Sequence, residues 1–198
     1  VIFYVQKTGE IYNSKTGKIW MDRNLGASQV ATSTTDPESY GDLYQWGRGT
    51  DGHEKRNSPT TSTLSSSDNP SHGNFIAVNS GNFDWRSPQN NNLWQGENGI
   101  NNPCPEGFRV PSAAELSVER ASWGYNNGFD AFLTPLRLPV AGIRSSNEGT
   151  IGFVGSFGYY WSGTVSGTSA QGLTFKNQGA GVDTYRRAYG FSIRCIKD

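Results

Sequence analysis

Few side chains in this 198-residue sequence have the types and spacing that catalysis or metal binding requires. The two cysteines, Cys104 and Cys195, lie too far apart for a CxxC redox pair or a zinc knuckle. They are either buried thiols of a reducing compartment or one disulfide of an oxidising compartment. A disulfide across so long a loop would stabilise the fold by about 4–5 kcal/mol in the chain-entropy model.

The two histidines, His53 and His72, lie in a polar tract near Asp51, Glu54 and Asp68. A zinc site needs three or four convergent ligands, usually at short helical or hairpin spacing. Two loop histidines without cysteine neighbours favour solvent-exposed side chains. We therefore expect no metal site and no cofactor.

Sequence signatures of common enzymes are absent from the chain. It contains no G-x-S-x-G nucleophile elbow, no P-loop and no H-E-x-x-H zinc motif. A carboxylate pair for glycoside hydrolysis would have to be assembled by folding, and no pair stands out along the sequence. The sequence therefore predicts a protein without catalytic activity.

The charge balance argues against two other classes of function. Lys and Arg together number 17, as do Asp and Glu, so the formal net charge is zero. A nucleic-acid-binding domain usually carries a basic excess, because neutralising phosphates dominates its affinity. No apolar run approaches the roughly 20 residues of a membrane-spanning helix. We expect neither nucleic-acid binding nor membrane insertion.

The composition predicts a compact, loop-rich domain with more strand than helix. Hydrophobic residues make up 34% of the chain, and 25 glycines interrupt most windows that could hold a long amphipathic helix. Aromatic residues make up 13%, which provides enough large rings to drive folding by burial.

Strand signals lie at both ends of the chain. Residues 1–25 alternate β-branched and aromatic segments, beginning with VIFYV, with glycine-containing turns. We expect the apolar first strand, VIFYV, to pair with another strand, such as one near the C-terminus. From Gly128 onward, short segments bounded by glycine predict further strands, and Phe191, Ile193 and Cys195 share one side of the last of them.

Two helix starts can be recognised. Asp36 precedes a proline at the first helical position, and a glutamate follows in the first turn. In VPSAAEL, Ser112 and Glu115 have the spacing of a capping box, which predicts a helix that ends at about Ser122. Residues 42–48 predict a strand or a buried turn.

Residues 49–103 form a long polar tract that we interpret as a loop insertion within one domain spanning residues 1–198. Loops of this length usually carry function or are packed by their own aromatic residues. The apolar anchors expected to attach this insertion to the core are Phe75, Ile76, Phe83, Trp85, Leu93 and Trp94.

Six blocks in this order resemble the Fibrobacter succinogenes major paralogous domain family, a group of bacterial surface and secreted modules. The blocks are GKIWMDRNLG (17–26), YGDLYQWG (40–47), CPEGFRVPSAAEL (104–116), GFDAF (128–132), YYWSGT (159–164) and GFSIRCIKD (190–198). That family is similar to C-type lectins and formylglycine-generating enzymes in fold.

The resemblance implies an α+β, C-type-lectin-like fold with short antiparallel strands, one or two helices and a long irregular insertion. It implies that Trp20, Trp46 and Trp161 are core residues, and that a disulfide joins Cys104 to Cys195. Calcium-dependent sugar-binding lectins carry Glu-Pro-Asn or Gln-Pro-Asp together with Trp-Asn-Asp. None of these motifs occurs here, so lectin-type calcium and sugar binding is not implied.

The segment 159–189 also resembles the variable region of proteins diversified by retroelements, which display hypervariable residues on this fold. Apolar residues that look fixed alternate there with residue types that mutation of Asn codons produces. The fixed-looking residues are Tyr160, Trp161, Ala170, Leu173, Phe175 and Val182. The expected ligand-binding residues are Tyr159, Ser169, Thr174, Lys176, Asp183, Tyr185, Arg187 and Tyr189.

These observations predict a ligand-binding module, because Tyr, Ser, Gly and Arg are typical of antibody-like binding surfaces. The expected ligand is a protein or a cell-surface structure, and the expected location is extracellular, on a cell or on a virion. Residues 144–148 are expected at the rim of the binding face. The alternatives are an undiversified, adhesin-like surface module, a degenerate formylglycine-generating-type enzyme, and a glycine-rich hairpin whose tyrosines only pack locally.

Overall fold

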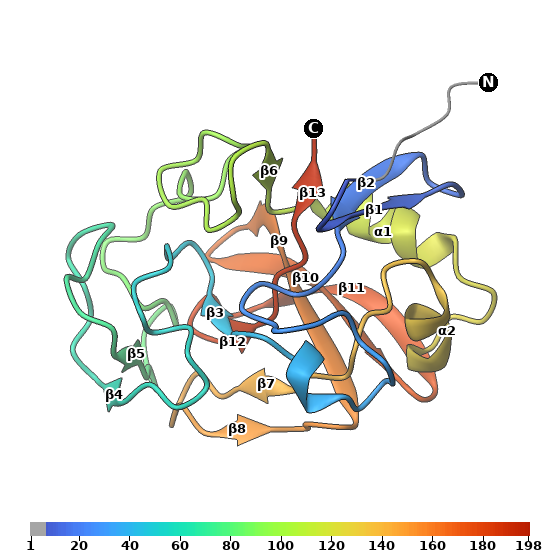
Figure 1. Cartoon of the computed structure of the whole chain (residues 1–198). Helices are drawn as coiled ribbons and strands as arrows, with labels where there is room; N and C mark the ends of the chain where they lie inside the picture. Colours follow the sequence, from blue (N-terminus) through green and yellow to red (C-terminus); the bar gives the residue numbers. More distant parts are fainter. Residues whose placement is uncertain (1–6) are drawn as a thin grey trace.

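A computed structural model describes residues 7–198 of the chain, so the strand expected at VIFYV lies outside the described residues. The described part is an α+β domain of several small sheets and two α-helices (Figure 1). The strands are β1 (Glu10–Asn13), β2 (Lys18–Met21), β3 (Tyr44–Gln45), β4 (Thr60–Thr61), β5 (Phe75–Ile76), β6 (Phe108–Arg109), β7 (Ile143–Arg144), β8 (Ile151–Gly152), β9 (Phe157–Ser166), β10 (Ser169–Lys176), β11 (Gly179–Tyr185), β12 (Gly190–Phe191) and β13 (Ile196–Lys197).

The longest strands form an antiparallel sheet in the order β11-β10-β9. In the register of this sheet, Leu173 lies opposite both Tyr160 and Val182, while Thr174 lies opposite both Tyr159 and Gly181. Because successive side chains of a strand point to opposite faces, these two sets define the two sides of the sheet. The side with Leu173 faces a core cluster that also contains side chains of the two helices.

The β1–β2 hairpin joins the C-terminal strand. The order of this sheet is β1-β2-β13-β6, and Ile196 lies opposite both Trp20 and Arg109. Figure 1 shows the hairpin beside β13 at the upper edge of the molecule. A third sheet has the order β3-β12-β7-β8. In it, β12, which follows β11 in the chain, lies between β3 and β7.

The helix α1 (Ala113–Ala121) confirms the capping-box prediction. The Ser112 hydroxyl accepts from the Glu115 amide, and the Glu115 carboxylate accepts from the Ser112 amide. A second helix, α2 (Gly128–Leu133), lies where only strands were expected, and the Asn127 side chain caps it by accepting from the Asp130 amide. The predicted start at Asp36 is confirmed as a single 3₁₀ turn, η1 (Pro37–Ser39).

The insertion 49–103 belongs to the same domain, because its apolar anchors are buried. Strands β4 and β5 pair in parallel, and Trp85, Leu93 and Trp94 are almost fully buried. Figure 1 shows the insertion on the side of the molecule opposite α1 and α2. Phe83 is the exception among the predicted anchors: it is only half-buried, because its side chain lines a surface groove.

The three core tryptophans and the disulfide are confirmed. Trp20, Trp46 and Trp161 are at most 1% exposed. Cys104 and Cys195 form a disulfide that joins the segment before β6 to the last strand segment. No helix within residues 7–198 is long and apolar enough to cross a membrane.

Removal of the disulfide should lower the free energy of unfolding substantially. For the double variant Cys104→Ala/Cys195→Ala we expect a loss of about 4–5 kcal/mol, because the reduced chain regains the entropy of an open loop. Urea denaturation of the variant and the oxidised parent measures this difference. A loss below about 1 kcal/mol would show that the bond does not constrain the unfolded chain.

Candidate ligand-binding surface

The sheet β9–β11 places four of the six predicted fixed residues, Tyr160, Leu173, Phe175 and Val182, on its helix side, whereas Trp161 and Ala170 pack on the other side with Tyr159 and Tyr185. Tyr160, Leu173 and Phe175 are fully buried on the helix side, where they pack with Trp123 and Leu136. On the opposite side, part of the surface is open to solvent. The alternation in the sequence thus corresponds only in part to the two faces of one sheet, because Trp161 and Ala170 share the face of the predicted binding residues.

The open face holds a pocket lined by Tyr159, Tyr185 and Tyr189, which we call the tyrosine pocket. Its volume is about 350 Å³, and its other wall comes from β7, β8 and their turn. All three tyrosines pack against the ring of Phe191, with centroid distances of 5.0, 5.0 and 5.9 Å. Three of the predicted binding residues therefore meet at one place, and the chain brings them there from β9, the end of β11 and the segment before β12.

Two phenols of this pocket, those of Tyr159 and Tyr185, are neutral at physiological pH. Burial raises the pKa of Tyr159, and the neighbouring Tyr185 and Tyr189 raise it further. Burial also raises the pKa of Tyr185, whose hydroxyl is hydrogen-bonded to the Thr174 hydroxyl. A neutral phenol both donates and accepts hydrogen bonds, so the pocket combines apolar ring surface with adaptable polar groups.

Most of the other predicted binding residues also lie outside the core. Thr174 lies opposite Tyr159, and Lys176 is exposed with its ammonium 5.6 Å from the Phe157 ring centroid. Asp183 is exposed on β11. Ser169 is half-buried at the end of the β9–β10 hairpin, farther along the sheet from the tyrosine pocket. These four residues surround the pocket or extend its face rather than line it.

Arg187 does not belong to this surface, contrary to the prediction. Its side chain is 0% exposed, and its guanidinium lies 4.5 Å from the Trp46 ring centroid. It donates hydrogen bonds to the Gly167 carbonyl (3.2 Å) and to Asn91 Oδ1 (2.6 Å), and it is ion-paired with Asp84 (3.6 Å). A cation needs such partners to be stable away from water. Arg187 thus joins the β9–β10 hairpin to the insertion.

The sequence did not identify the far wall of the tyrosine pocket. Phe153, which follows β8, lines it and remains 59% exposed, and Ser145 and Thr150 lie at the turn between β7 and β8. Residues 144–148 do reach the rim in part, since Ser145 lines the pocket. Arg144 is buried instead, with its guanidinium 4.2 Å from the Phe75 ring centroid. The sequence offered one signal for this wall, an aromatic residue, Phe153, that directly follows Gly152.

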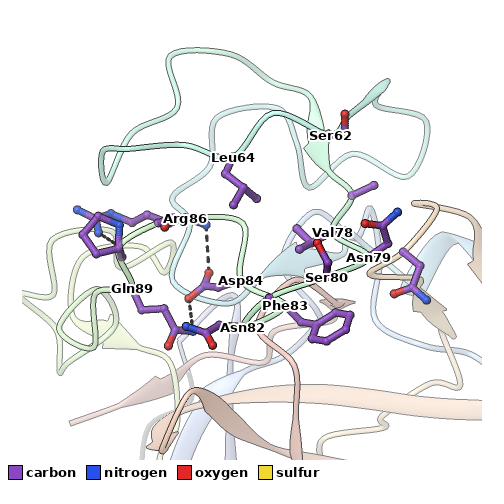
Figure 2. A pocket seen from close by; sticks show the side chains of 15 residues that line it. Ser62, Leu64, Val78, Asn79, Ser80, Asn82, Phe83, Asp84, Arg86 and Gln89 are labelled. Atoms are coloured by element: carbon purple, nitrogen blue, oxygen red, sulfur yellow. Dashed lines mark hydrogen bonds between the residues drawn. The ribbon is translucent and has the colours of Figure 1, made fainter.

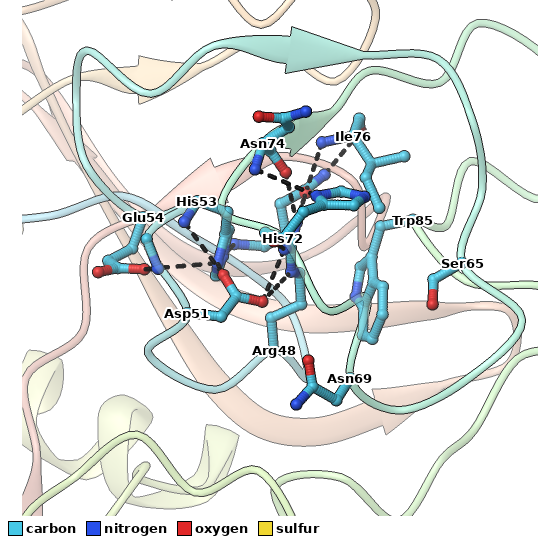
Figure 3. Close-up of polar contacts among 12 residues, drawn as sticks. Arg48, Asp51, His53, Glu54, Ser65, Asn69, His72, Asn74, Ile76 and Trp85 are labelled. Atoms are coloured by element: carbon cyan, nitrogen blue, oxygen red, sulfur yellow. Dashed lines mark hydrogen bonds and ion pairs between the residues drawn. The ribbon is translucent and has the colours of Figure 1, made fainter.

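The histidine prediction was wrong for His53, which is fully buried (Figure 3). Its Nε2 accepts from the Gln45 amide (3.0 Å), so Nδ1 carries the proton and donates to Asp51 (2.6 Å). The other Asp51 oxygen lies 2.6 Å from Arg48. Arg48 also donates to the backbone carbonyls of His72 and Asn74, which attaches the insertion to β3.

The same cluster contains the one group among residues 7–198 that could hold a metal ion. Ligand atoms of Asp51, His53 and Glu54 lie within 4.8 Å of one another. Both ring nitrogens of His53 have hydrogen-bond partners, and Glu54 accepts from the Gly52 amide (2.8 Å). These hydrogen bonds hold the loop in its conformation, so all three side chains have a structural role.

Burial lowers the pKa of His53 to about 4, against the opposing effect of its hydrogen bond to Asp51. Burial alone would raise the pKa of Asp51, but the hydrogen bond and charge interactions with His53 and Arg48 lower it to about 2. His53 is therefore a neutral hydrogen-bonding bridge in the folded protein at neutral pH.

No protein-family model, no curated protein and no solved structure shows a significant match to this chain. The chemistry of the surface is therefore interpreted from its own geometry.

Replacing Arg187 should destabilise the protein far more than replacing its neighbour Arg186. Arg187→Ala leaves the nearly buried Asp84 without its cation and several carbonyls without donors, so we expect a loss of about 3–5 kcal/mol in the free energy of unfolding. Arg186→Ala is the matched control, because Arg186 is exposed, and we expect a loss below about 1 kcal/mol. Urea denaturation compares the two, and equal losses would contradict the structural role of Arg187.

Stability should decrease as the pH is lowered through the range between the two pKa values of His53. The unfolded chain binds the proton near pH 6.5 and the folded protein only near pH 4, so stability is complete above pH 6.5 and falls by about 3 kcal/mol towards pH 4. Denaturant titrations across this range measure the slope. His53→Gln should flatten it, whereas His72→Gln should retain it, and a slope that survives in His53→Gln would assign the effect to other groups.

Proposed function

We propose that this protein is a non-catalytic ligand-binding module with a C-type-lectin-like fold. It presents the tyrosine pocket and the surrounding face of β9–β11 to a protein or cell-surface ligand. The observation that carries this proposal is the convergence of Tyr159, Tyr185 and Tyr189 on one open pocket, above a sheet whose other face is fully packed. Neither nucleic-acid binding nor membrane insertion is part of this proposal.

The physical properties of the pocket suit protein recognition. Tyrosine provides a large contact area at a low cost in side-chain entropy, and its hydroxyl adapts to different polar partners. Lys176 and Asp183 place one charge of each sign on the exposed face beside the rings. A hydrophobic centre with a polar rim is the usual anatomy of an interface that binds specifically.

The arrangement also supports diversification of this face by a retroelement. Tyr159, Thr174, Lys176, Asp183, Tyr185 and Tyr189 are partly or fully exposed, so substitutions there leave the core intact. The fixed-looking residues Tyr160, Leu173 and Phe175 are those that the core requires. Arg187 is excluded from the variable set because of its buried partners.

The state of the cysteines supports a binding role over the formylglycine-generating type of chemistry. Both are consumed in the Cys104–Cys195 disulfide, and residues 7–198 contain no free cysteine. A disulfide of this kind persists in oxidising environments, which supports an extracellular location on a cell or a virion.

A displayed library tests whether this face can carry new binding specificities. We expect a library randomised at Tyr159, Thr174, Lys176, Asp183, Tyr185 and Tyr189 to yield clones that bind hen egg-white lysozyme and melt within a few degrees of the parent, because none of these side chains is fully buried. The control library randomises exposed residues of the helical side, Val118, Tyr125, Phe129 and Leu133. Equal success of the control library, or general unfolding of the first, would contradict the proposal.

The neighbouring DNA distinguishes the diversified version from an undiversified, adhesin-like module. A retroelement requires a near-copy of the 3′ coding end that differs at adenines, together with a reverse transcriptase gene. We expect both the near-copy and the reverse transcriptase gene to be present, with the adenine differences confined to codons of the exposed face. Their absence would remove diversification and leave the adhesin-like module as the better description.

A further inference from the structure

A second concave site lies in the insertion, outside the face described above (Figure 2). Ser62 and Leu64 form one side of it, and residues 77–84 and 86–89 form the other, so we call it the insertion groove. Its volume is about 760 Å³. That value lies within the roughly 300–1,000 Å³ of small-molecule sites in proteins.

The groove opens where two neighbouring segments separate. Thr61 pairs with Ile76 at one end, and Ser65 forms a parallel bridge with Arg86 at the other. Between these two points, the stretch 77–85 is longer than the stretch 62–64 and bends away from it. The groove is therefore held open by backbone pairing at both ends rather than by side chains alone.

Several polar side chains along the groove have no partner within the described residues. Ser62, Asn79, Ser80 and Asn82 are exposed, and within residues 7–198 their side chains have no hydrogen-bond partner. Two other asparagines of the insertion, Asn90 and Asn101, hydrogen-bond to separate segments and so have structural roles. The amides and hydroxyls of the groove thus offer both donors and acceptors to a ligand.

The ionic groups of the groove are already neutralised. Asp84 is ion-paired with Arg187 (3.6 Å) and accepts from Gln89 (2.9 Å). Arg86 is ion-paired with Asp68 (2.8 Å). Since no charge in the lining lacks a counter-charge, the groove favours a ligand without net charge over an anion or a cation.

An aromatic ring completes the lining. Phe83 adopts a left-handed conformation (φ 51°), which is rare for a bulky residue and suggests a functional constraint. The Arg186 guanidinium lies 3.6 Å from the ring centroid, and the ring remains half-buried at the edge of the groove (Figure 2). Arg186 covers one face of the ring, so only the other face can attract the polarised C–H groups of a sugar ring.

We propose that the insertion groove binds a neutral oligosaccharide. Hydroxyl groups of the sugar pair with Asn79, Asn82 and the serines, and one sugar ring stacks on Phe83. The site needs no metal ion, because its one carboxylate, Asp84, is engaged with Arg187 and Gln89. This binding is independent of the tyrosine pocket.

Calorimetric titration of the intact protein with maltohexaose, cellohexaose, xylohexaose, mannohexaose and chitohexaose tests the proposal. We expect saturable binding of at least one hexaose, unchanged by EDTA. The double variant Asn79→Ala/Asn82→Ala should weaken it about tenfold or more, since two hydrogen-bonding side chains are lost. Phe83→Gly should weaken it as well while keeping the fold, because glycine accepts the left-handed conformation.

Tyr185→Ala is the matched control and should bind the sugar like the parent, which separates this site from the tyrosine pocket. Failure of all five sugars to bind, or binding unaffected by both groove variants, would overturn the proposal. Binding of a neutral Gly-Ser peptide without any of the sugars would also overturn it and would assign the groove to a polypeptide.

Discussion

The packing around Phe191 is the contact on which the binding face depends. Its ring stacks on Trp161 at a centroid distance of 4.1 Å, and Tyr159, Tyr185 and Tyr189 surround it. Such aromatic contacts add about 0.5–1.5 kcal/mol each beyond the burial of their area. One buried ring therefore sets the position of three tyrosines that come from different parts of the chain.

The sheet accommodates this ring because of a glycine. A Cβ at Gly172 would lie 2.9 Å from the Tyr160 carbonyl oxygen and 3.4 Å from the Phe191 ring. Gly172 lies within the segment 159–189, but this close approach makes it part of the scaffold rather than of the variable set. Composition alone does not separate a glycine that is free to vary from one that the packing requires.

Local signals in the sequence predicted much of the fold. The capping box of Ser112 and Glu115, the β1–β2 hairpin and the burial of Trp20, Trp46 and Trp161 follow from spacing and residue type. The helix α2 was missed for two reasons. It begins with Gly128, a poor helix former, and its six residues are too few to show the spacing of apolar residues that identifies a helix. Its cap, Asn127, is the one local signal that was present.

The candidate site was predictable only in part, because exposure depends on contacts that are distant in the sequence. Tyr185 and Tyr189 could be named from residue type and position. Arg187 lies in the same segment and is also a residue type of binding surfaces. Its guanidinium is nevertheless enclosed by Trp46 and, from the insertion, by Asp84 and Asn91. His53 is a different case, because its hydrogen-bond partners Gln45 and Asp51 lie only eight and two residues before it in the sequence.

The Cys104–Cys195 bond has one more consequence, which concerns cleavage of the chain by proteases. All residues that line the tyrosine pocket, from Ile143 to Tyr189, lie between the two cysteines. A single cut anywhere in that interval leaves both fragments covalently joined. A nicked molecule therefore keeps every part of its recognition face on one particle, even after the chain that builds it is broken.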